Sequence, residues 1–552
     1  MSTSANSRRA FVIAAGCALL VHGFVASQTT NSRGSADLAG SYKVTGTVVS
    51  KIDAHPLDRA RVTLADAKNS QKVESIITTE DGKFAFESVP AGKYSLTAAK
   101  RGFITGSYDQ HDAFSTAIVT GAGLDTEGLV LKLAPNAAIW GRVLDEAGEP
   151  VRRASVALYY DDHVEGVDQI RARDDTQTDD LGTYELPELT PGTYFLSTRA
   201  TPWYAIHPPS TSGAQDKAAF DRSLDVAYPV TYYPDVADSD SATPISLKGG
   251  ERVQIDIHLN PVPALRLLFR VPGDAQHGFV FPRLEQPTFD GSTFVETGGA
   301  YQVSPGVFEV TGIPAGRYNV RLQGQGINMQ MNGVDVSKDG EQIDATAAEP
   351  LSRVKILVQI PGESSIPKGL LISLLSKGRN VTGFHTLDAK GEAEIGEVPA
   401  GRYEMLAWGT RKLYSIARAT AEGAEVTGHS IILPPGASAS ASITLVQGSV
   451  EVEGSVKKAG KGFAGAMVVL VPKDPEGHRD RFRRNQSDLD NTFSLHRVVP
   501  GSYYLVAIEN GWDLDWSQSA VIAGYAKHGR SIEVRDLGKP LSLPEAIEVQ
   551  SR

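Results

Sequence analysis

The sequence contains almost no cysteine: one residue, Cys17, in 552. A disulfide needs two cysteines, so no intrachain disulfide can form, and stability must come from the packing of apolar side chains. A chain of this length is too long for a single hydrophobic core. The sequence therefore predicts several domains without covalent crosslinks between cysteines.

Positive charge and long apolar runs are also scarce. Lysine and arginine number 54 against 65 aspartates and glutamates, which gives a net charge of −11. Such a surface repels phosphate backbones and anionic lipids, so nucleic acid is not an expected partner. Beyond residue 27 no run approaches the ~20 apolar residues of a membrane span. No transmembrane segment is therefore expected after removal of the N-terminal segment.

Residues 1–27 predict an export signal. Two arginines precede a largely apolar stretch, and small residues precede Gln28, where cleavage is expected. The alternatives are an uncleaved membrane anchor and a lipid-modified Cys17. The expected location is secreted, periplasmic or otherwise in the cell envelope, with residues 28–40 as a linker.

Helix signals are nearly absent, because no long stretch with a period of 3.6 residues carries caps at both ends. The expected fold class is therefore all-β. Two segments, Asp161–Asp180 and Thr201–Asp225, are interpreted as loops too long for simple hairpins. Long loops on rigid sandwiches are common binding sites.

A short motif, written "VPAGKYSLTA" at its first occurrence from Val89, occurs five times at spacings typical of whole domains. Each copy has a tyrosine, a glycine two residues earlier, and a glycine or asparagine twelve residues earlier. The tyrosines are Tyr94, Tyr194, Tyr318, Tyr403 and Tyr503, and the nearer glycines are Gly92, Gly192, Gly316, Gly401 and Gly501. The earlier residues are Gly82, Gly182, Gly306, Gly391 and Asn491.

The spacing of this motif predicts a corner between two strands. The residue twelve positions before the tyrosine suits a left-handed turn, and the nearer glycine is also expected to have a positive φ. The tyrosine opens the next strand, and its hydroxyl is expected to return to the backbone, as in the tyrosine corner of β-sandwiches. We therefore expect a tandem array of about five Ig-like or transthyretin-like β-sandwich domains. The expected boundaries are 41–134, 135–262, 263–350, 351–446 and 447–552.

The segments upstream of the corners carry a family resemblance. "GTVVSKIDAHPLDRARVTL" and "GRVLDEAGEPVRRASVAL" share their glycine, valine, proline and alanine positions, and "GSVKKAGKGFAGAMVVL" matches in part. This pattern resembles the carboxypeptidase regulatory-like domain, a transthyretin-like sandwich. Residues 231–259 look like the tail that follows such domains in exported bacterial proteins. The resemblance implies a non-catalytic accessory domain, similar in fold to carbohydrate-binding modules.

Enzyme motifs are missing. The twelve histidines are scattered singly and form no zinc-peptidase motif, and neither a Gly-x-Ser-x-Gly elbow nor a phosphate loop occurs. The chain is therefore not expected to be an enzyme. Pilin and adhesin sandwiches share a related corner but need a glutamate shortly after the tyrosine for a Lys–Asn crosslink, and none stands at that place. A self-crosslinked adhesin and an accessory subunit of a peptidase remain as alternatives.

Two charged segments are candidate ion sites. The acid-rich segment 161–180 lacks the spacing of a calcium loop, so no metal and no cofactor is expected, with calcium as the alternative. The basic segment 478–486 is interpreted as a solvated loop rather than an anion site.

Six aromatic residues in or beside loops are the candidate ligand-binding residues: Trp203, Tyr204, Tyr232, Tyr233, Trp512 and Trp516. Flat rings bind sugar faces by apolar contact, so the expected partner is a polysaccharide, or else an envelope protein. The function predicted is an exported, non-catalytic binding or scaffold protein, and the alternative is a purely structural spacer array. Binding predicts that these rings are exposed on loops, whereas the spacer predicts that they are buried at domain junctions.

Overall fold

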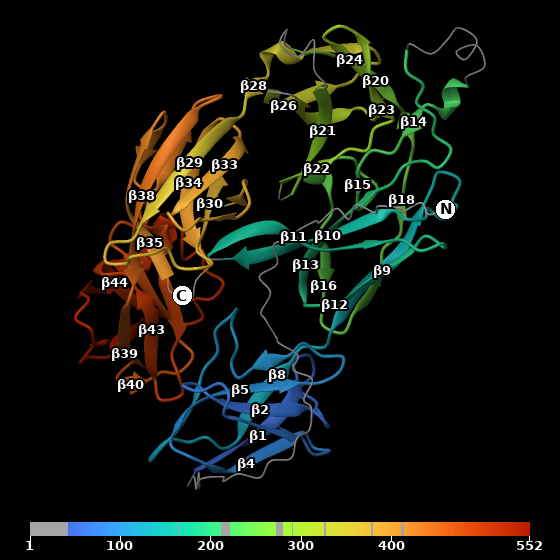
Figure 1. The fold of residues 1–552 in the computed structure, drawn as a ribbon. Helices are drawn as coiled ribbons and strands as arrows, with labels where there is room; N and C mark the ends of the chain where they lie inside the picture. Colours follow the sequence, from blue (N-terminus) through green and yellow to red (C-terminus); the bar gives the residue numbers. More distant parts are fainter. Residues whose placement is uncertain are drawn as a thin grey trace, which may run out of the picture.

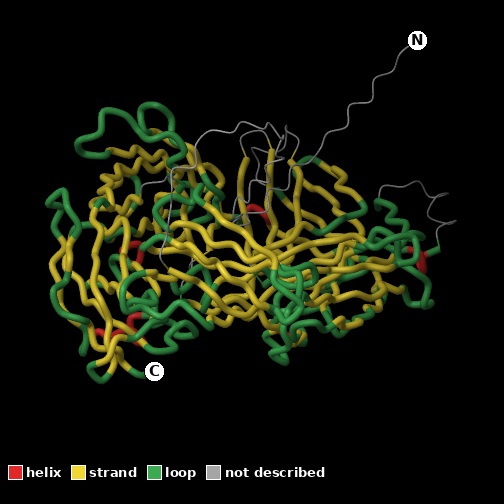
Figure 2. The backbone as a smooth tube through the Cα atoms, turned by 90° about the horizontal axis from the view of Figure 1, so that it is seen from below, coloured by secondary structure: helices red, strands yellow, loops and turns green. Residues whose placement is uncertain are grey.

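The computed structural model describes residues 42–164, 166–210, 221–271, 280–289, 291–324, 327–376, 379–409 and 413–552. The predicted export signal, linker and Cys17 lie outside these ranges. The described residues are mostly strand and loop (Figure 2), which confirms the all-β class. Within them the one α-helix is α2 (Ser519–Ala526), and no helix is long and apolar enough to cross a membrane.

The strands form five sandwich units that share one topology (Figure 1). In every unit the first strand pairs antiparallel with the strand before the corner and parallel with a late strand. The corner strand itself pairs with an earlier strand in the opposite sheet. The five repeats of the motif therefore correspond to five copies of the same pair of sheets.

Units one and two occupy the N-terminal half of the described chain. Unit one contains β1 (Tyr42–Ser50), β2 (Arg61–Asp66), β3 (Val73–Ile77), β4 (Lys83–Val89), β5 (Gly92–Ala99), β6 (Gly106–Ser107), β7 (Ile118–Thr120) and β8 (Leu129–Leu133). Unit two contains β9 (Ala137–Leu144), β10 (Ser155–Val164), β11 (Val167–Gln177), β12 (Thr183–Leu189), β13 (Gly192–Arg199), η1 (Arg222–Leu224), β14 (Val226–Ala227), β15 (Thr231–Tyr232), η2 (Ser239–Ser241), β16 (Ile245–Leu247), β17 (Arg252–Gln254) and β18 (Ile257–His258). The short strand β19 (Val262–Pro263) pairs with β14 and leads into unit three.

Units three, four and five follow in the C-terminal half. Unit three contains β20 (Leu265–Arg270), β21 (Val280–Thr288), β22 (Gly291–Phe294), β23 (Gly299–Ser304), β24 (Val307–Ile313), β25 (Gly316–Gly324), β26 (Ile327–Val336), β27 (Glu341–Asp344), η4 (Ala345–Ala347) and β28 (Glu349–Pro350). Unit four contains β29 (Ser352–Gln359), β30 (Leu371–Ser376), β31 (Arg379–Asn380), β32 (His385–Thr386), β33 (Glu392–Val398), β34 (Gly401–Trp408), β35 (Leu413–Glu422), β36 (Glu425–Thr427), β37 (Ser430–Leu433) and β38 (Ser438–Gly448). Unit five contains β39 (Val450–Lys458), β40 (Lys461–Gly462), β41 (Met467–Pro472), η5 (Arg479–Arg481), β42 (Arg483–Gln486), β43 (Thr492–Val498), β44 (Gly501–Ile508), α2, β45 (Arg530–Val534), β46 (Leu541–Ser542) and β47 (Ile547–Gln550).

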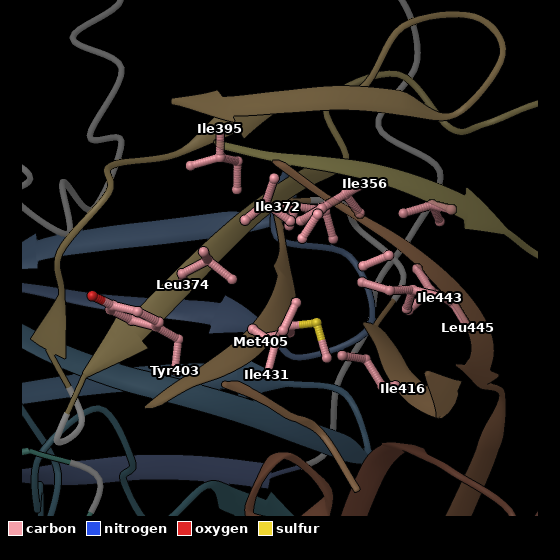
Figure 3. Close-up of a cluster of buried hydrophobic side chains, with 14 of the residues drawn as sticks. Ile356, Ile372, Leu374, Ile395, Tyr403, Met405, Ile416, Ile431, Ile443 and Leu445 are labelled. Carbon is pink, nitrogen blue, oxygen red and sulfur yellow. The ribbon is translucent and has the colours of Figure 1, made fainter. Parts of the chain in front are cut away.

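Each unit encloses its own apolar core between its two sheets. The corner strands supply alternate residues to it, because side chains of a strand point to opposite faces in turn. In unit four, Tyr403 and Met405 of β34 face Ile356, Ile372 and other aliphatic side chains (Figure 3). The cores explain how the chain folds without disulfides.

Unit five differs because the sheet formed by β41 and β44 is buried on both faces. Val468 and Leu505 face the core shared with the other strands of this unit. Val469 and Val506 face a second apolar cluster, which includes Trp512, Trp516 and Ile522 of α2. The near-continuous apolar sequence of β41 follows from this double burial.

The residue twelve positions before each corner tyrosine has a positive φ, between 66° and 83°, which confirms the left-handed turn predicted there. At Gly182 an added Cβ would lie 2.7 Å from the carbonyl oxygen of Val143. Glycine is therefore required at this turn both by the backbone conformation and by the close approach of strand β9.

The segment Asp161–Asp180 is not the long loop that was expected. β10 and β11 form one extended antiparallel hairpin, and Val164 pairs with Val167 across its turn. Opposite charges on the two strands also pair diagonally, as in Asp162 and Arg171, which lie 3.8 Å apart. The many charges suggested a loop, but this hairpin projects from its sandwich toward unit five, where polar side chains suit an exposed ribbon (Figure 1).

The five units close into a ring instead of extending as a rod. Unit five contacts unit four, through which the chain reaches it, and also returns to units one and two. Arg481 bonds Ser415 of unit four, Lys93 of unit one pairs with Asp488, and Ser517 donates to the carbonyl of Gly166 in the β10–β11 hairpin. Residues almost 400 positions apart in sequence are thus in direct contact.

Candidate functional site

The five corner tyrosines have the same geometry. Each is buried, and each hydroxyl donates to the backbone carbonyl four residues earlier. The acceptors are the carbonyl oxygens of Pro90 (3.0 Å), Thr190 (2.7 Å), Pro314 (2.6 Å), Pro399 (2.7 Å) and Val499 (2.7 Å). Burial raises the pKa of all five tyrosines, that of Tyr503 to about 12. The phenols are therefore held neutral as donors.

The glycine two residues before the tyrosine does not serve the purpose that was expected. The φ angle is outside the left-handed region at Gly92, Gly192 and Gly316. At Gly401 and Gly501 the φ angles, 156° and 158°, are close to those of an extended chain. In unit two the reason for glycine is contact with an aromatic ring. There an added Cβ would lie 2.4 Å from the ring of Tyr160, and in unit three it would lie 3.2 Å from the hydroxyl of Tyr318. In units one, four and five the corner tyrosine lies at an ordinary van der Waals distance of 3.4 to 3.5 Å.

The left-handed residue near the corner lies four positions before that glycine. Glu188, Glu397 and Arg497 have φ between 56° and 58°, and Gly312 has 75°. In all five units the pairing with the first strand shifts its register at this place. Sequence reasoning missed this bulge, because glutamate and arginine give no signal of a positive φ.

The contact between units one and five, here called the one–five junction, contains Trp512. Its indole stacks on His111 with ring centroids 5.2 Å apart and also contacts Phe114. The neighbouring Trp516 is covered by the guanidinium of Arg484, whose Cζ lies 4.2 Å from the ring centroid. Both indoles are buried, so their faces are occupied by the protein itself.

The basic segment 478–486 is not a solvated loop, and this prediction was wrong. The side chain of Arg484 is 7% exposed and pairs with Asp112 of unit one at 3.2 Å. Gln486 is fully buried, and its amide nitrogen donates to the carbonyl of Asp109 at 2.6 Å and to Thr116 at 2.7 Å. The charges are used between units, where aromatic faces and carboxylates replace water around them.

The contact between units two and three contains Tyr232. This side chain is fully buried, and the ring of Phe289 from unit three lies 5.5 Å from it. Phe289 also contacts Tyr159 and Phe195 of unit two. Tyr233 is partly buried and packs against the core of unit two. The ring of Tyr232 therefore presents no open face at a loop.

Trp203 is the exposed member of the six predicted residues, with 86% of its surface accessible. Its ring meets the edge of Tyr204, with centroids 5.7 Å apart. The Tyr204 hydroxyl donates to Glu146, which also accepts from Tyr228 at 3.0 Å. Burial and this carboxylate raise the pKa of Tyr204 to about 12. An exposed indole therefore lies beside a tyrosine that is fixed by a hydrogen bond.

A second exposed aromatic pair lies in unit four and was missed from the sequence. Phe384 and Trp408 meet edge to face with centroids 5.8 Å apart, and both are more than 40% exposed. The indole nitrogen of Trp408 donates to Ser373 at 2.7 Å. Trp408 ends the corner strand β34 on the face opposite Tyr403, so the alternation of side chains along the strand places it away from the core.

The acids of segment 161–180 lie along the β10–β11 hairpin and in the turn after it, and three of them illustrate how they are bound within the protein. Asp168 bonds His163 at 2.7 Å, Asp179 accepts from the backbone of Leu181 and Thr183, and Asp180 pairs with Arg152. They do not converge on one point, as the six to eight oxygens around calcium must. Glu165 lies outside the described residues.

A family model for the carboxypeptidase regulatory-like domain matches residues 43–121 and 138–210. The matched stretches cover most of unit one and the first part of unit two. The shared topology of the other units extends the same architecture along the chain. Comparison with curated proteins finds no match.

Solved structures show a distant likeness. The Bacillus anthracis TIE protein is 11% identical, with 75% of each chain covered and a TM-score of 0.17. The minor pilin GBS52 of Streptococcus agalactiae is 16% identical over 40% of this chain and 97% of that chain, with a TM-score of 0.21. The shaft pilin SpaA of Lactobacillus rhamnosus GG is 11% identical over 40% and 97%, with a TM-score of 0.19.

Proposed function

We propose that this protein is an exported, non-catalytic scaffold of the cell envelope or extracellular space, whose five sandwiches form one compact platform. The observation that carries this proposal is the one–five junction. Charged, aromatic and amide side chains join the two ends of the described chain there, so the units are held in a fixed arrangement. Such an arrangement suits the presentation of surfaces at set positions better than the spanning of a distance.

The burial of Tyr232, Trp512 and Trp516 supports the scaffold. A ring whose faces contact other side chains of the same protein contributes to stability and leaves no surface for a sugar. Three of the six predicted ligand-binding residues are therefore used to hold units together. This is the outcome that a structural role of the array predicts for them.

Small-angle X-ray scattering of the purified protein tests the closed ring. The unsubstituted protein should scatter as a compact particle. A variant with Lys93→Glu and Arg484→Glu places like charges opposite Asp488 and Asp112, and should increase the radius of gyration by opening the junction. The control, Lys83→Glu with Lys461→Glu, makes the same change of charge at exposed positions of the same two units. An extended particle in the unsubstituted protein would refute the platform.

A second candidate function, polysaccharide binding, is supported by Trp203. The exposed indole of Trp203 lies against Tyr204, so the two rings form an apolar patch and not a single exposed side chain. The indole of Trp203 and the fixed ring of Tyr204 offer the two apolar faces that a sugar requires, with the carboxylate of Glu146 nearby for a hydroxyl.

Co-sedimentation with insoluble polysaccharides tests this candidate, with tryptophan fluorescence as a second readout. Trp203→Ala should abolish binding without lowering the unfolding temperature, and Trp408→Ala should leave binding unchanged. Loss of binding with Trp408→Ala alone would move the site to unit four. Absence of binding to every polysaccharide would leave the scaffold without this ligand.

Export is supported by the composition of residues 1–27. Intact mass of the protein recovered from the periplasm or medium tests it, and a chain that begins near Gln28 is expected. Loss of one ammonia or water for each crosslink would instead support the self-crosslinked alternative. A lipid adduct on Cys17 would place the protein on a membrane.

A further inference from the structure

A group of polar side chains at the contact between units four and five contains buried atoms without hydrogen-bond partners. His429 of unit four lies beside His478 and Asp480 of unit five, and their ligand atoms are all within 4.8 Å of one another. The side chains of His429 and Asp480 are 8% and 9% exposed. The Oδ1 atom of Asp480 and the Nδ1 atom of His478 are buried and have no hydrogen-bond partner. Buried polar atoms without partners are rare, because each loses its hydrogen bonds to water on folding and gains none in return.

The backbone holds these three residues in place. His429 lies in the turn between β36 and β37, and its carbonyl accepts from the amide of Met405 on the corner strand at 2.9 Å. His478 and Asp480 begin the short helix η5, two residues apart. The side chain of His478 makes no capping hydrogen bond there. The group is therefore assembled by the docking of two units.

We propose that His429, His478 and Asp480 bind a single Zn²⁺ ion that fastens unit four to unit five. Two imidazoles and a carboxylate are a donor set that zinc accepts, at about 2.0–2.2 Å from the metal in a tetrahedral arrangement. Ligands of such a site lie about 3.4 Å apart. The Nδ1 atom of His429 lies 3.6 Å from Oδ1 of Asp480, which is too long for a hydrogen bond and close to that spacing.

A fourth position is available from the neighbouring hollow of about 670 Å³, which His429 lines together with Glu404. Water or the Glu404 carboxylate is the expected fourth ligand. The surrounding arginines have other contacts, since Arg481 bonds Ser415 and Arg479 reaches Ser517. The carboxylates Asp474 and Glu476 line the same hollow as Arg479 and offset the positive charge there.

In a comparable group between units two and five, both ring nitrogens of the histidine have hydrogen-bond partners. Nδ1 of His163 lies 2.7 Å from Asp168, and Nε2 lies 2.8 Å from the carbonyl of Leu514. Both ring nitrogens are used, so no nitrogen remains for a metal ion. His163 is thus a matched control: it is a histidine beside aspartates, at a contact with the same unit.

The inference goes beyond the scaffold role and does not depend on it. Calorimetric titration of the chelator-treated, full-length protein with ZnCl₂ should give one site per chain. His429→Gln and Asp480→Asn should each weaken binding more than about 100-fold, because even the loss of an outer contact costs 10–100-fold. His163→Gln should bind as the unsubstituted protein does. X-ray absorption at the zinc edge should show two nitrogen neighbours at about 2.0–2.1 Å.

Three outcomes would overturn the proposal. They are the absence of a one-to-one site, binding unchanged by His429→Gln and Asp480→Asn, and binding lost in His163→Gln alone. Unfolding curves of the variants, recorded in the absence of metal, serve as the control for misfolding. The absorption measurement uses the unsubstituted protein, so the proposal stays falsifiable even if one variant does not fold.

Discussion

The imidazole of His111 in unit one stacks on the indole of Trp512 in unit five, with planes 7° from parallel. The two residues are about 400 positions apart in the sequence, and their contact joins the first described unit to the last. Aromatic pairs of this kind contribute about 0.5–1.5 kcal/mol beyond the area they bury. Substitution of a residue of this stack therefore tests directly whether the five units close into a ring.

Trp512→Ala should lower the free energy of unfolding of unit five by about 3–5 kcal/mol, since it removes a buried indole between two units. Trp512→Phe should cost less, because it retains a ring and removes an indole nitrogen that has no hydrogen-bond partner. Denaturant unfolding followed by circular dichroism measures both. Trp203→Ala is the control, and an equal loss in that exposed variant would contradict the assignment.

Tyr503→Phe should destabilise unit five by about 1–3 kcal/mol, because the carbonyl of Val499 loses its donor inside the protein. Tyr301→Phe is the matched control, since this tyrosine is 37% exposed and its hydroxyl makes only a long contact of 3.4 Å. Thermal unfolding measures the melting temperatures of the two variants. Equal melting temperatures for both variants would show that the corner hydrogen bond contributes nothing.

Gly192→Ala should be more destabilising than Gly92→Ala, although both glycines occupy the same place in the motif. The added Cβ would lie 2.4 Å from the ring of Tyr160 in unit two but 3.4 Å from the ring of Tyr94 in unit one. Differential scanning calorimetry of the two variants measures the difference. Equal losses would support a common requirement of the backbone over contact with the ring.

Stability should fall as the pH rises from about 10 to about 12. The pKa of Tyr503 is raised from 10.0 to about 12 in the folded chain, so above pH 10 the unfolded chain loses a proton that the folded chain retains. Unfolding then releases protons, and alkali favours it. Melting temperatures across this range, with tyrosinate absorbance, measure the effect. Tyr503→Phe should weaken the dependence in unit five.

The repeated strands were predictable because their chemistry is local. A left-handed residue, two core residues on one face and a tyrosine at fixed spacing specify a corner wherever they occur, so Gly82 and Asn491 were assigned to turns from the sequence alone. The boundaries of independently folding domains, at 41–134 and onward, remain a prediction. Proteolysis of single units tests them.

The junctions were not predictable because they depend on how the units dock. Arg484 and Gln486 resemble residues of a solvated loop until unit one covers them. Trp512 was predicted to bind a ligand for the same reason. From the sequence alone, an indole in a loop can either bind a sugar or pack against another unit. His429 and His478 lie 49 positions apart and belong to different units, so no motif joins them.

The closed ring also sets an order for biosynthesis. Units one and two can fold while the rest of the chain is still being made, because domains generally fold as units from the N-terminus. Their contact surfaces around Phe114 and the β10–β11 hairpin stay bare until residues 482–516 have been added. A ribosome that stops before that point releases a fragment with folded sandwiches and an uncovered contact surface. Such a fragment would differ from the complete protein in this exposed surface and not in the folding of units one and two.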